Sequence, residues 1–429
     1  MAERDHMRLG DLVLDVRPLR ESRDFRYLFL ARLVSLFGIG FTAVAVPVQV
    51  YRLTGSSLQV SLVSVAIVVP MLAGTLAGGT LADRVDRRRL IVWARGGSVP
   101  VFLALALNAA ADSPQLWAIY VCVAANSVLA GLSATALMAA TPALVGRDQL
   151  AAAGALMAIT AELGAIAGPS LGGVLIAAFG FTANYLLAAA ATLVTTSLVA
   201  LVRPLPRTGP PPSRPLRSIT EGLRFALGSR VITGLLLIDL CIALFATPFA
   251  LFPELAERTF NGSPGVAGLL YAAPAAGALV AAVASGWTGR VRRTGRFLVG
   301  ATIAGGLAVM GFGLSAGVLW AALACLAVLG AADTTSEILR RSLLQHHTPD
   351  HLQGRVSSLW LAQTNIGPAL GNFEAGLLAR AVGPVAALVA GGAVCAASAA
   401  GLAGASPALR QASLRDAGAG DLPDPAPAR

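Results

Sequence analysis

The sequence has no lysine, because all 32 of its basic residues are arginine. A nucleotide-binding loop of the G-x-x-x-x-G-K-[ST] kind needs a lysine, so an ATP-driven pump built on that loop is excluded. Charged residues are also scarce, at 13% of the 429 residues, whereas hydrophobic residues make up 56% and mean hydropathy is +0.72. This composition lies outside the usual range of soluble domains and indicates a membrane protein.

Cysteine and histidine are rare as well, with four of each. No paired spacing relates the cysteines, which are Cys122, Cys241, Cys325 and Cys395. His346, His347 and His351 cluster beside a single carboxylate, Asp350, and we interpret them as a solvated loop. With no Ser, His and Asp set inside the apolar runs either, we expect no disulfide, no metal, no cofactor and no enzyme activity.

Apolar runs long enough to cross a bilayer recur along the chain. A bilayer core takes about 20 residues of helix. Twelve runs can be drawn, at 27–50, 57–81, 90–110, 115–139, 150–178, 182–202, 231–253, 264–288, 297–316, 318–340, 355–379 and 382–405. We therefore predict an all-α membrane protein with twelve transmembrane helices.

One long connection divides these runs into two groups of six. It is rich in proline and arginine, which is typical of a linker. The predicted order is a cytoplasmic N-terminal segment at 1–26, a six-helix bundle at 27–202, a cytoplasmic linker at 203–230, a second six-helix bundle at 231–405 and a disordered cytoplasmic tail at 406–429.

Short phrases recur between the two groups. "GPSLG" at 168–172 returns as "GPALG" at 367–371, and "TP" follows both the fourth and the tenth run, at 141–142 and 348–349. Many transporter folds are built from such related halves, with the substrate at their interface. We interpret the chain as two six-helix pseudo-repeats.

Arginine placement predicts the orientation, because cytoplasmic loops carry the excess of positive charge. With the N-terminus inside, Arg52, Arg258 and Arg380 fall on outer loops, Arg32 lies in the first span and the other arginines fall on the inner side. Both termini are then cytoplasmic. The net charge of +10 reflects this topology and an attraction to membrane lipids, and nothing indicates nucleic-acid binding.

The loop "GGTLADRVDRRRL" at 78–90 concentrates charge between two apolar runs. Its residues resemble the signature G-x-L-x-D-R-x-G-R-R that the major facilitator superfamily carries between its second and third helices, departing only at Asp86, where glycine is usual. The matching gating-loop residues are Gly79, Asp83, Arg84, Arg87 and Arg88. The resemblance implies the major facilitator fold.

A physical role for this loop follows from Asp83. A helix N-terminus presents unpaired N–H groups and partial positive charge, and the eleventh span is expected to begin near Gly354 on the same side. A contact between Asp83 and that helix end would join the two halves only when the cytoplasmic side is closed. The contact would then act as a latch that favours the outward-open state. The alternative is that the loop only fixes the membrane topology through its positive charge. This alternative explains the arginines but not Asp83.

A second signature lies in the fifth span. Glycines four apart let helices approach closely, and proline bends a helix. The residues are Gly164, Gly168, Pro169, Gly172 and Gly173. They resemble the helix 5 motif of exporters in the superfamily, and the alternative is generic packing of small residues.

Longer phrases carry a closer resemblance. "LADRVDRRRLIVWARG", "LMAATPALVGRDQL" and "TPDHLQGRVSSLWLAQ" are similar to the bacterial enterobactin exporters, over most of residues 18–405. This resemblance implies secondary export of a catecholate siderophore, or a related amphipathic metabolite, across the bacterial inner membrane. Proton antiport is the expected energy source and a monomer is sufficient. A multidrug or antibiotic efflux pump of the same fold is the alternative.

Polar side chains inside spans are functional candidates, because an ionised group at mid-membrane costs about 2.5–3.5 kcal/mol or more. We predict proton-coupling or substrate-binding roles among Glu162, Asp239, Asp333, Glu337, Arg32 and Asn126. Glu162 is preferred because it precedes the glycine motif near the middle of its span. Glu337 could instead form a structural ladder with Arg341, and Arg32 could snorkel to the inner surface.

The helix 4 arginine of many proton-coupled exporters is absent here, and Asn126 is the strong polar group of that span. Other polar or aromatic groups expected at the central cavity are Gln49, Gln363, Asn365, Trp360 and Tyr271. Such sparse polar groups in an apolar cavity suit a bulky amphipathic substrate.

Overall fold

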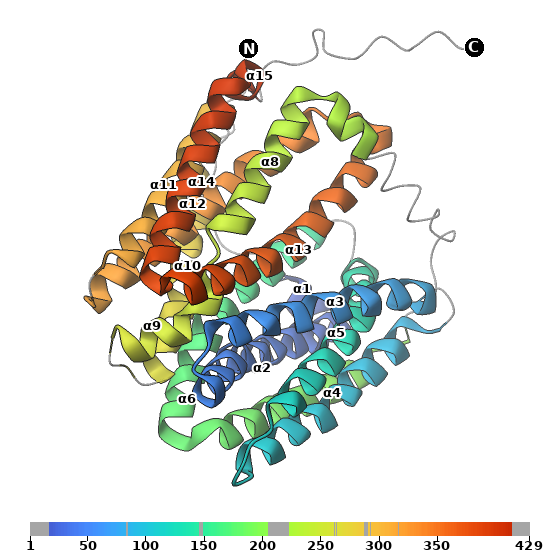
Figure 1. The fold of residues 1–429 in the computed structure, drawn as a ribbon. Coiled ribbons are helices and arrows are strands. Elements are labelled where there is room, and N and C mark those ends of the chain that lie inside the picture. Colours follow the sequence, from blue (N-terminus) through green and yellow to red (C-terminus); the bar gives the residue numbers. More distant parts are fainter. Residues whose placement is uncertain are drawn as a thin grey trace.

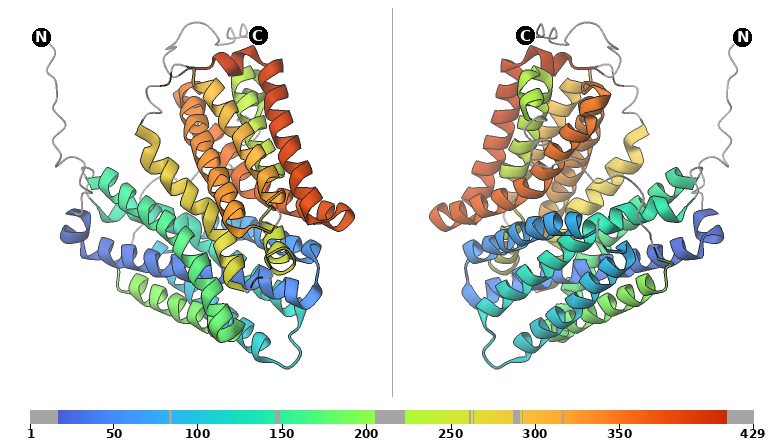
Figure 2. Two further views of the ribbon diagram at one scale, coloured as in Figure 1. Left: turned by 90° about the vertical axis from the view of Figure 1, so that its left-hand side faces the viewer. Right: turned by 90° about the vertical axis from the view of Figure 1, so that its right-hand side faces the viewer.

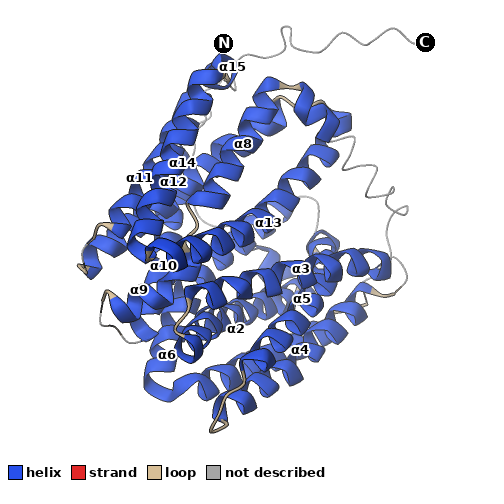
Figure 3. Ribbon diagram, viewed as in Figure 1, coloured by secondary structure: helices blue, strands red, loops and turns tan. Residues whose placement is uncertain are grey.

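The computed structural model describes residues 17–82, 85–145, 149–204, 223–260, 262, 264–286, 291, 293–315 and 317–413. Helices joined by short loops form this part of the chain, with no strand among the described residues (Figure 3). The all-α prediction is confirmed.

The first group of helices extends to residue 200. It comprises α1 (Arg17–Glu21), α2 (Arg23–Thr54), α3 (Ser57–Ala82), α4 (Arg87–Ala110), α5 (Leu116–Leu144) and α6 (Leu150–Ala200). Ser22 caps α2 by accepting a hydrogen bond from the backbone N–H of Phe25, and Asp86 caps α4 by accepting one from Arg89. Asp86, the position that departs from the family signature, therefore serves as the N-cap of α4.

α6 contains two of the predicted spans. It is 51 residues long and is broken at Gly180, where φ is 77° and ψ is 179°, a conformation that favours glycine. Both sides of the break pack against the same part of α2, because Gly164 faces Leu36 and Ala191 faces Gly38. The chain therefore folds back at Gly180, where the sequence predicted the boundary between the fifth and sixth spans.

The second group of helices begins at residue 230. It comprises α8 (Arg230–Phe245), the 3₁₀ turn η3 (Phe249–Leu251), α9 (Phe252–Arg258), α10 (Pro264–Val283), α11 (Thr294–Gly313), α12 (Leu319–His346), α13 (Asp350–Val382), α14 (Pro384–Ala405) and α15 (Pro407–Gln411). The predicted span at 231–253 is wrong as one helix, because α8 ends before Pro248, which lacks a backbone N–H. The Asn372 side chain of α13 instead accepts a hydrogen bond from the Ala250 N–H, at 2.9 Å.

Ten helices among the described residues are long and apolar enough to cross a membrane. This number counts α6 once, from Leu163 to Ala200, and joins α8 to α9 as one segment; α13 is not among the ten. The chain is a multi-pass membrane protein. Twelve spans in two pseudo-repeats stay a prediction.

The glycine motif of α6 makes close helix contacts. A Cβ built on Gly168 would lie 2.8 Å from the Cα of Gly40 in α2, and one on Gly172 would lie 3.0 Å from the Cα of Phe41. Gly173 faces the other group of helices, since a Cβ there would lie 2.6 Å from the carbonyl oxygen of Pro264 in α10. The packing role of these residues is observed, whereas a link to the direction of transport stays a prediction.

The two helix groups meet at one end of the molecule. We call this the α9 end; it carries Arg52, Gly180 and Arg258, whereas the opposite, α1 end carries Ser22 and Leu144, which are hydrogen-bonded to one another. α10 packs against α6, and α13 packs against α3 (Figure 1). Toward the α1 end the ribbons of the two groups diverge (Figure 2).

The predicted linker and tail lie partly outside the described residues. Residues 223–228, at the end of the predicted linker, are helical. In the segment predicted as a disordered tail, α15 forms, Leu409 is fully buried and the Gly295 N–H donates to the Ala412 carbonyl at 3.0 Å. The first residues after position 405 therefore belong to the folded part of the chain.

Candidate functional site

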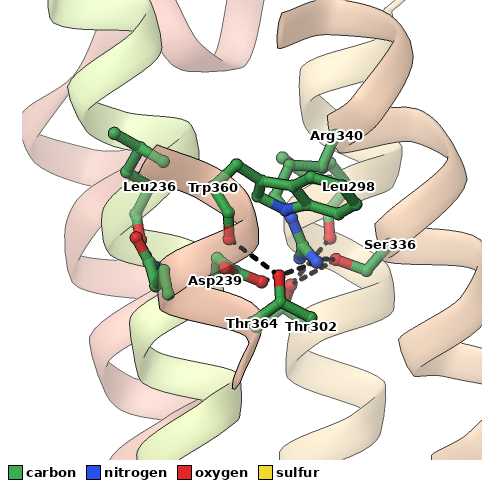
Figure 4. A network of polar contacts seen from close by, with 9 residues as sticks. Leu236, Asp239, Leu298, Thr302, Ser336, Arg340, Trp360 and Thr364 are labelled. Carbon is green, nitrogen blue, oxygen red and sulfur yellow. Dashed lines mark hydrogen bonds and ion pairs between the residues drawn. The ribbon is translucent and has the colours of Figure 1, made fainter. Parts of the chain in front are cut away.

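A buried ion pair joins two helices of the second group. The Nη2 atom of Arg340 in α12 lies 2.6 Å from the Oδ1 atom of Asp239 in α8, and the two side chains are only 5% and 8% exposed. Figure 4 shows them pointing toward one another between the helices. Asp239 was predicted as a candidate, whereas Arg340 was missed because its neighbour Arg341 was assigned the structural role.

Hydroxyl groups extend this site toward α11. Ser336 accepts a weak hydrogen bond from Nη1 of Arg340 at 3.5 Å, and its hydroxyl lies 3.4 Å from that of Thr302. Two polar atoms of the ion pair, Oδ2 of Asp239 and Nε of Arg340, are buried without a hydrogen-bond partner among the described residues. The pair therefore keeps free acceptor and donor capacity, which a proton or a substrate group could use.

α13 closes the other side of the site (Figure 4). Nε2 of Gln363 donates to the Leu236 carbonyl of α8 at 2.7 Å, tying the two helices together. Trp360 lies in the same region with its indole N–H buried and unpaired, and the Arg341 guanidinium lies 5.1 Å from the centre of its ring. Arg341 thus makes a cation–π contact in place of the predicted ladder with Glu337.

Asp333 and Glu337 lie on α12 as predicted and differ in their surroundings. Asp333 lines a small pocket with Thr302, Ile242 and neighbouring apolar residues, and retains exposed surface. The pocket offers about 10 Å³, which is about the space that one water needs. Glu337 is half-buried and forms no ion pair with a described residue.

The structure does not bring the other candidates to this site. The backbone of Glu162 is helical within α6, and its side chain lies outside the described part. Asn126 in α5 is half-buried and forms no hydrogen bond with a described side chain. Arg32 lies in α2, where its Nε atom is buried without a partner. The roles of all three stay predictions.

The predicted gating loop is described only in part. Asp83 and Arg84 lie outside the described residues, so the structure does not place the proposed latch. Arg88 donates from Nη2 to the Ala200 carbonyl at the C-terminus of α6, where a cation is favourable for the exposed carbonyls and the helix dipole. Arg87 is half-buried, and no heavy atom lies within 4 Å of a Cβ built on Gly79.

Several predicted cavity residues serve packing instead. The Gln49 side chain is 3% exposed and accepts a hydrogen bond from the Tyr185 hydroxyl at 2.7 Å, inside the first helix group. The Tyr271 hydroxyl donates to the Phe249 carbonyl at 2.8 Å. The four cysteines are free, and no group of three metal-ligating side chains occurs in the described ranges.

A polar contact closes the α9 end, and sequence reasoning missed it. The Ser57 hydroxyl of α3 donates to Oε2 of Glu254 in α9, with both residues buried, and Oε1 of Glu254 pairs with Arg258 at 3.1 Å. Arg52 and Glu257 form a second bridge between the two groups at 3.2 Å. The acids at positions 254 and 257 could have indicated this contact in the sequence, because they follow an apolar segment and lie close to Pro253.

Substituting Ser57→Ala is expected to weaken the closed α9 end. Glu254 would keep Arg258 and lose a hydrogen bond to a charged group, which contributes about 1.5–3 kcal/mol. Spin labels across this end should report about a ten- to hundredfold shift toward separated halves. Ser127→Ala is the control, because the Ser127 hydroxyl bonds only the Val123 carbonyl of its own helix. An unchanged distance distribution in Ser57→Ala would contradict the prediction.

Comparison with known proteins gives matches along nearly the whole chain. The family model described as transmembrane secretion effector matches residues 15–426. The enterobactin exporter EntS of Shigella boydii serotype 18 is 38% identical over 381 residues, which are 89% of this chain and 91% of that protein. EntS of Citrobacter koseri is 39% identical over 375 residues, covering 87% and 89%.

Solved transporter structures share the arrangement of helices. The nucleoside transporter NupG matches with a TM-score of 0.72 at 11% identity, covering 89% of this chain and 99% of that one. A bacterial homologue of the iron transporter ferroportin, in an inward-facing state, matches with a TM-score of 0.65 at 18% identity, covering 88% and 98%. At these identities the matches establish the fold alone.

Proposed function

Because this chain belongs to the transmembrane secretion effector family of the major facilitator superfamily, we propose that it is a secondary exporter of a catecholate siderophore or a related amphipathic metabolite. The observation that carries the proposal is the end-to-end relationship to proteins named enterobactin exporter. The small-molecule substrate would bind between the two helix groups, which in this proposal correspond to two repeats of six spans each.

The same proposal assigns the α1 end to the cytoplasm of a bacterial inner membrane. The arginines of the loop at 87–89 lie at this end, and positive charge favours the cytoplasmic side. The contacts at the α9 end and the divergence at the α1 end then correspond to an inward-open state, able to load substrate from the cytoplasm (Figure 2). A monomer in contact with anionic lipids is sufficient for this cycle.

Proton antiport is the proposed energy source, with no cofactor. Asp239 is the acid we assign first, because its free Oδ2 atom is buried between α8 and α12 and its charge is balanced by Arg340. Protonation would release Arg340, and deprotonation would restore the pair. Glu162 stays the second candidate for this role.

Deletion of the gene is expected to trap the substrate in the cell. Under iron starvation, mass spectrometry should find catecholate siderophore lost from the medium and accumulated inside, and the intact gene should restore secretion. Re-expressed Asp112→Asn is a control, because Asp112 is exposed between α4 and α5. An unchanged metabolite profile would reject siderophore export, and raised drug susceptibility in the same strain would assign efflux of drugs instead.

A further inference from the structure

Two arginines meet inside the first helix group, where helices are otherwise apolar. Arg32 and Arg95 each lie about two turns inside their helices, α2 and α4. Nη1 of Arg95 donates to the Ser35 hydroxyl of α2 at 3.0 Å. Ser35 stands one turn after Arg32 on the same helix face, and the charge of Arg32 acts on the Arg95 guanidinium.

No acid balances this pair among the described side chains. Neither arginine forms an ion pair there, and Nε of Arg32 is buried with no hydrogen-bond partner. Arg340 in the second helix group shows the contrast, because Asp239 neutralises it at 2.6 Å. Unbalanced charge within membrane helices is costly and marks binding or transport pathways.

Snorkelling, the simpler role considered for Arg32, does not fit this geometry. A snorkelling arginine extends its guanidinium to the membrane surface, where water solvates it. Arg95 instead turns to a hydroxyl of another helix, and the Nε atom of Arg32 is inaccessible. Both side chains still retain some exposed surface, so a small ligand group has a route to them.

We propose that Arg32 and Arg95 form a subsite for a planar pair of anionic oxygens on the exported molecule, such as a carboxylate or a catecholate. The inference rests on the proposed export function and names the part of the substrate that the first helix group holds. Guanidinium groups present parallel N–H donors that match two such oxygens, and the binding of an anion would remove the repulsion between the arginines. Within the described part of the protein, the two arginine side chains donate only one hydrogen bond, from Arg95 to Ser35.

Binding to the purified full-length protein tests this subsite without measuring export. Calorimetry with benzoate, 2,3-dihydroxybenzoate and inorganic sulfate should show binding of the two planar anions and much weaker binding of sulfate. Arg32→Gln and Arg95→Gln should each weaken it about tenfold or more, and Arg95→Lys should recover part of the affinity because it keeps the charge. Arg230→Gln, an exposed arginine at the start of α8, is the matched control.

Thermal melting of the ligand-free protein distinguishes a role of the two arginines in binding from a role in stability. Removing one of two repelling charges should leave the melting temperature of Arg95→Gln unchanged or raised. A lowered melting temperature with wild-type anion binding would overturn the proposal and make the arginines structural. Equal binding of sulfate would overturn the assigned planar chemistry, and wild-type anion affinity in both arginine variants would overturn the subsite itself. If binding follows the arginines while the deletion strain still secretes its siderophore, the subsite stands and the proposed cargo is wrong.

Discussion

Asp239→Asn is expected to abolish proton-driven transport and to destabilise the protein. Arg340 would stay buried without its ion-pair partner, and breaking such a pair from one side costs about 3–5 kcal/mol. Transport should fall to background in proteoliposomes under a pH gradient, with a lowered melting temperature in detergent.

The double variant Asp239→Asn with Arg340→Gln separates coupling from stability. Removing both charges should restore much of the melting temperature, since a neutral pair avoids the uncompensated arginine. Transport should remain at background, because the ion pair no longer contains an acid that can exchange a proton. If the double variant transports like the wild type, Asp239 has a structural role and the coupling group lies elsewhere.

Gly268→Leu is expected to prevent closure of the α9 end. A Cβ on Gly268 would lie 2.6 Å from the Pro169 carbonyl oxygen and 3.0 Å from the Cα of Gly173, so a leucine cannot fit between α6 and α10. Overpacking costs about 1–3 kcal/mol, and more where backbone meets backbone, which shifts a two-state equilibrium by tenfold or more. Export should be lost because the inward-open state becomes inaccessible.

Distances across the α9 end provide the measurement. With the native cysteines replaced, spin labels at Leu53→Cys and Thr259→Cys should move apart in Gly268→Leu. Gly300→Leu is the matched control, because no described atom beyond the adjoining backbone of its own helix lies within 4 Å of a Cβ at that position. Wild-type distances together with wild-type export would show that the glycine contact is dispensable.

Sequence patterns predicted the helices well and the ion pair only in part. Hydrophobic length located most helices within a few residues, and the boundary predicted between the spans at 150–178 and 182–202 coincides with the turn at Gly180. Asp239 was predicted because an acid within an apolar run is conspicuous, whereas Arg340 lies near a helix end beside a second arginine. Which of the two faces α8 depends on the rotation of α12, which a single sequence does not specify.

The contacts at the α9 end were beyond sequence reasoning for a related reason. Apolar length alone extended the seventh span through residues 246–248, although Pro248 was visible in the sequence. Because the helix breaks there, Glu254 lies on a short helix against α3, where it meets Ser57. That pairing joins residues far apart in the chain and exists only when the halves are together, so no local pattern indicates it.

The ion pair of α8 and α12 has an electrical consequence. While Asp239 and Arg340 are paired, they carry no net charge and the membrane potential does no work on them. A proton on Asp239 neutralises the acid and leaves the positive charge of Arg340 in the membrane field. Moving one elementary charge across the membrane changes the free energy by about 2.3 kcal/mol per 100 mV. An exporter coupled at this pair would therefore draw on voltage as well as on the pH difference, and its cycle would be electrogenic.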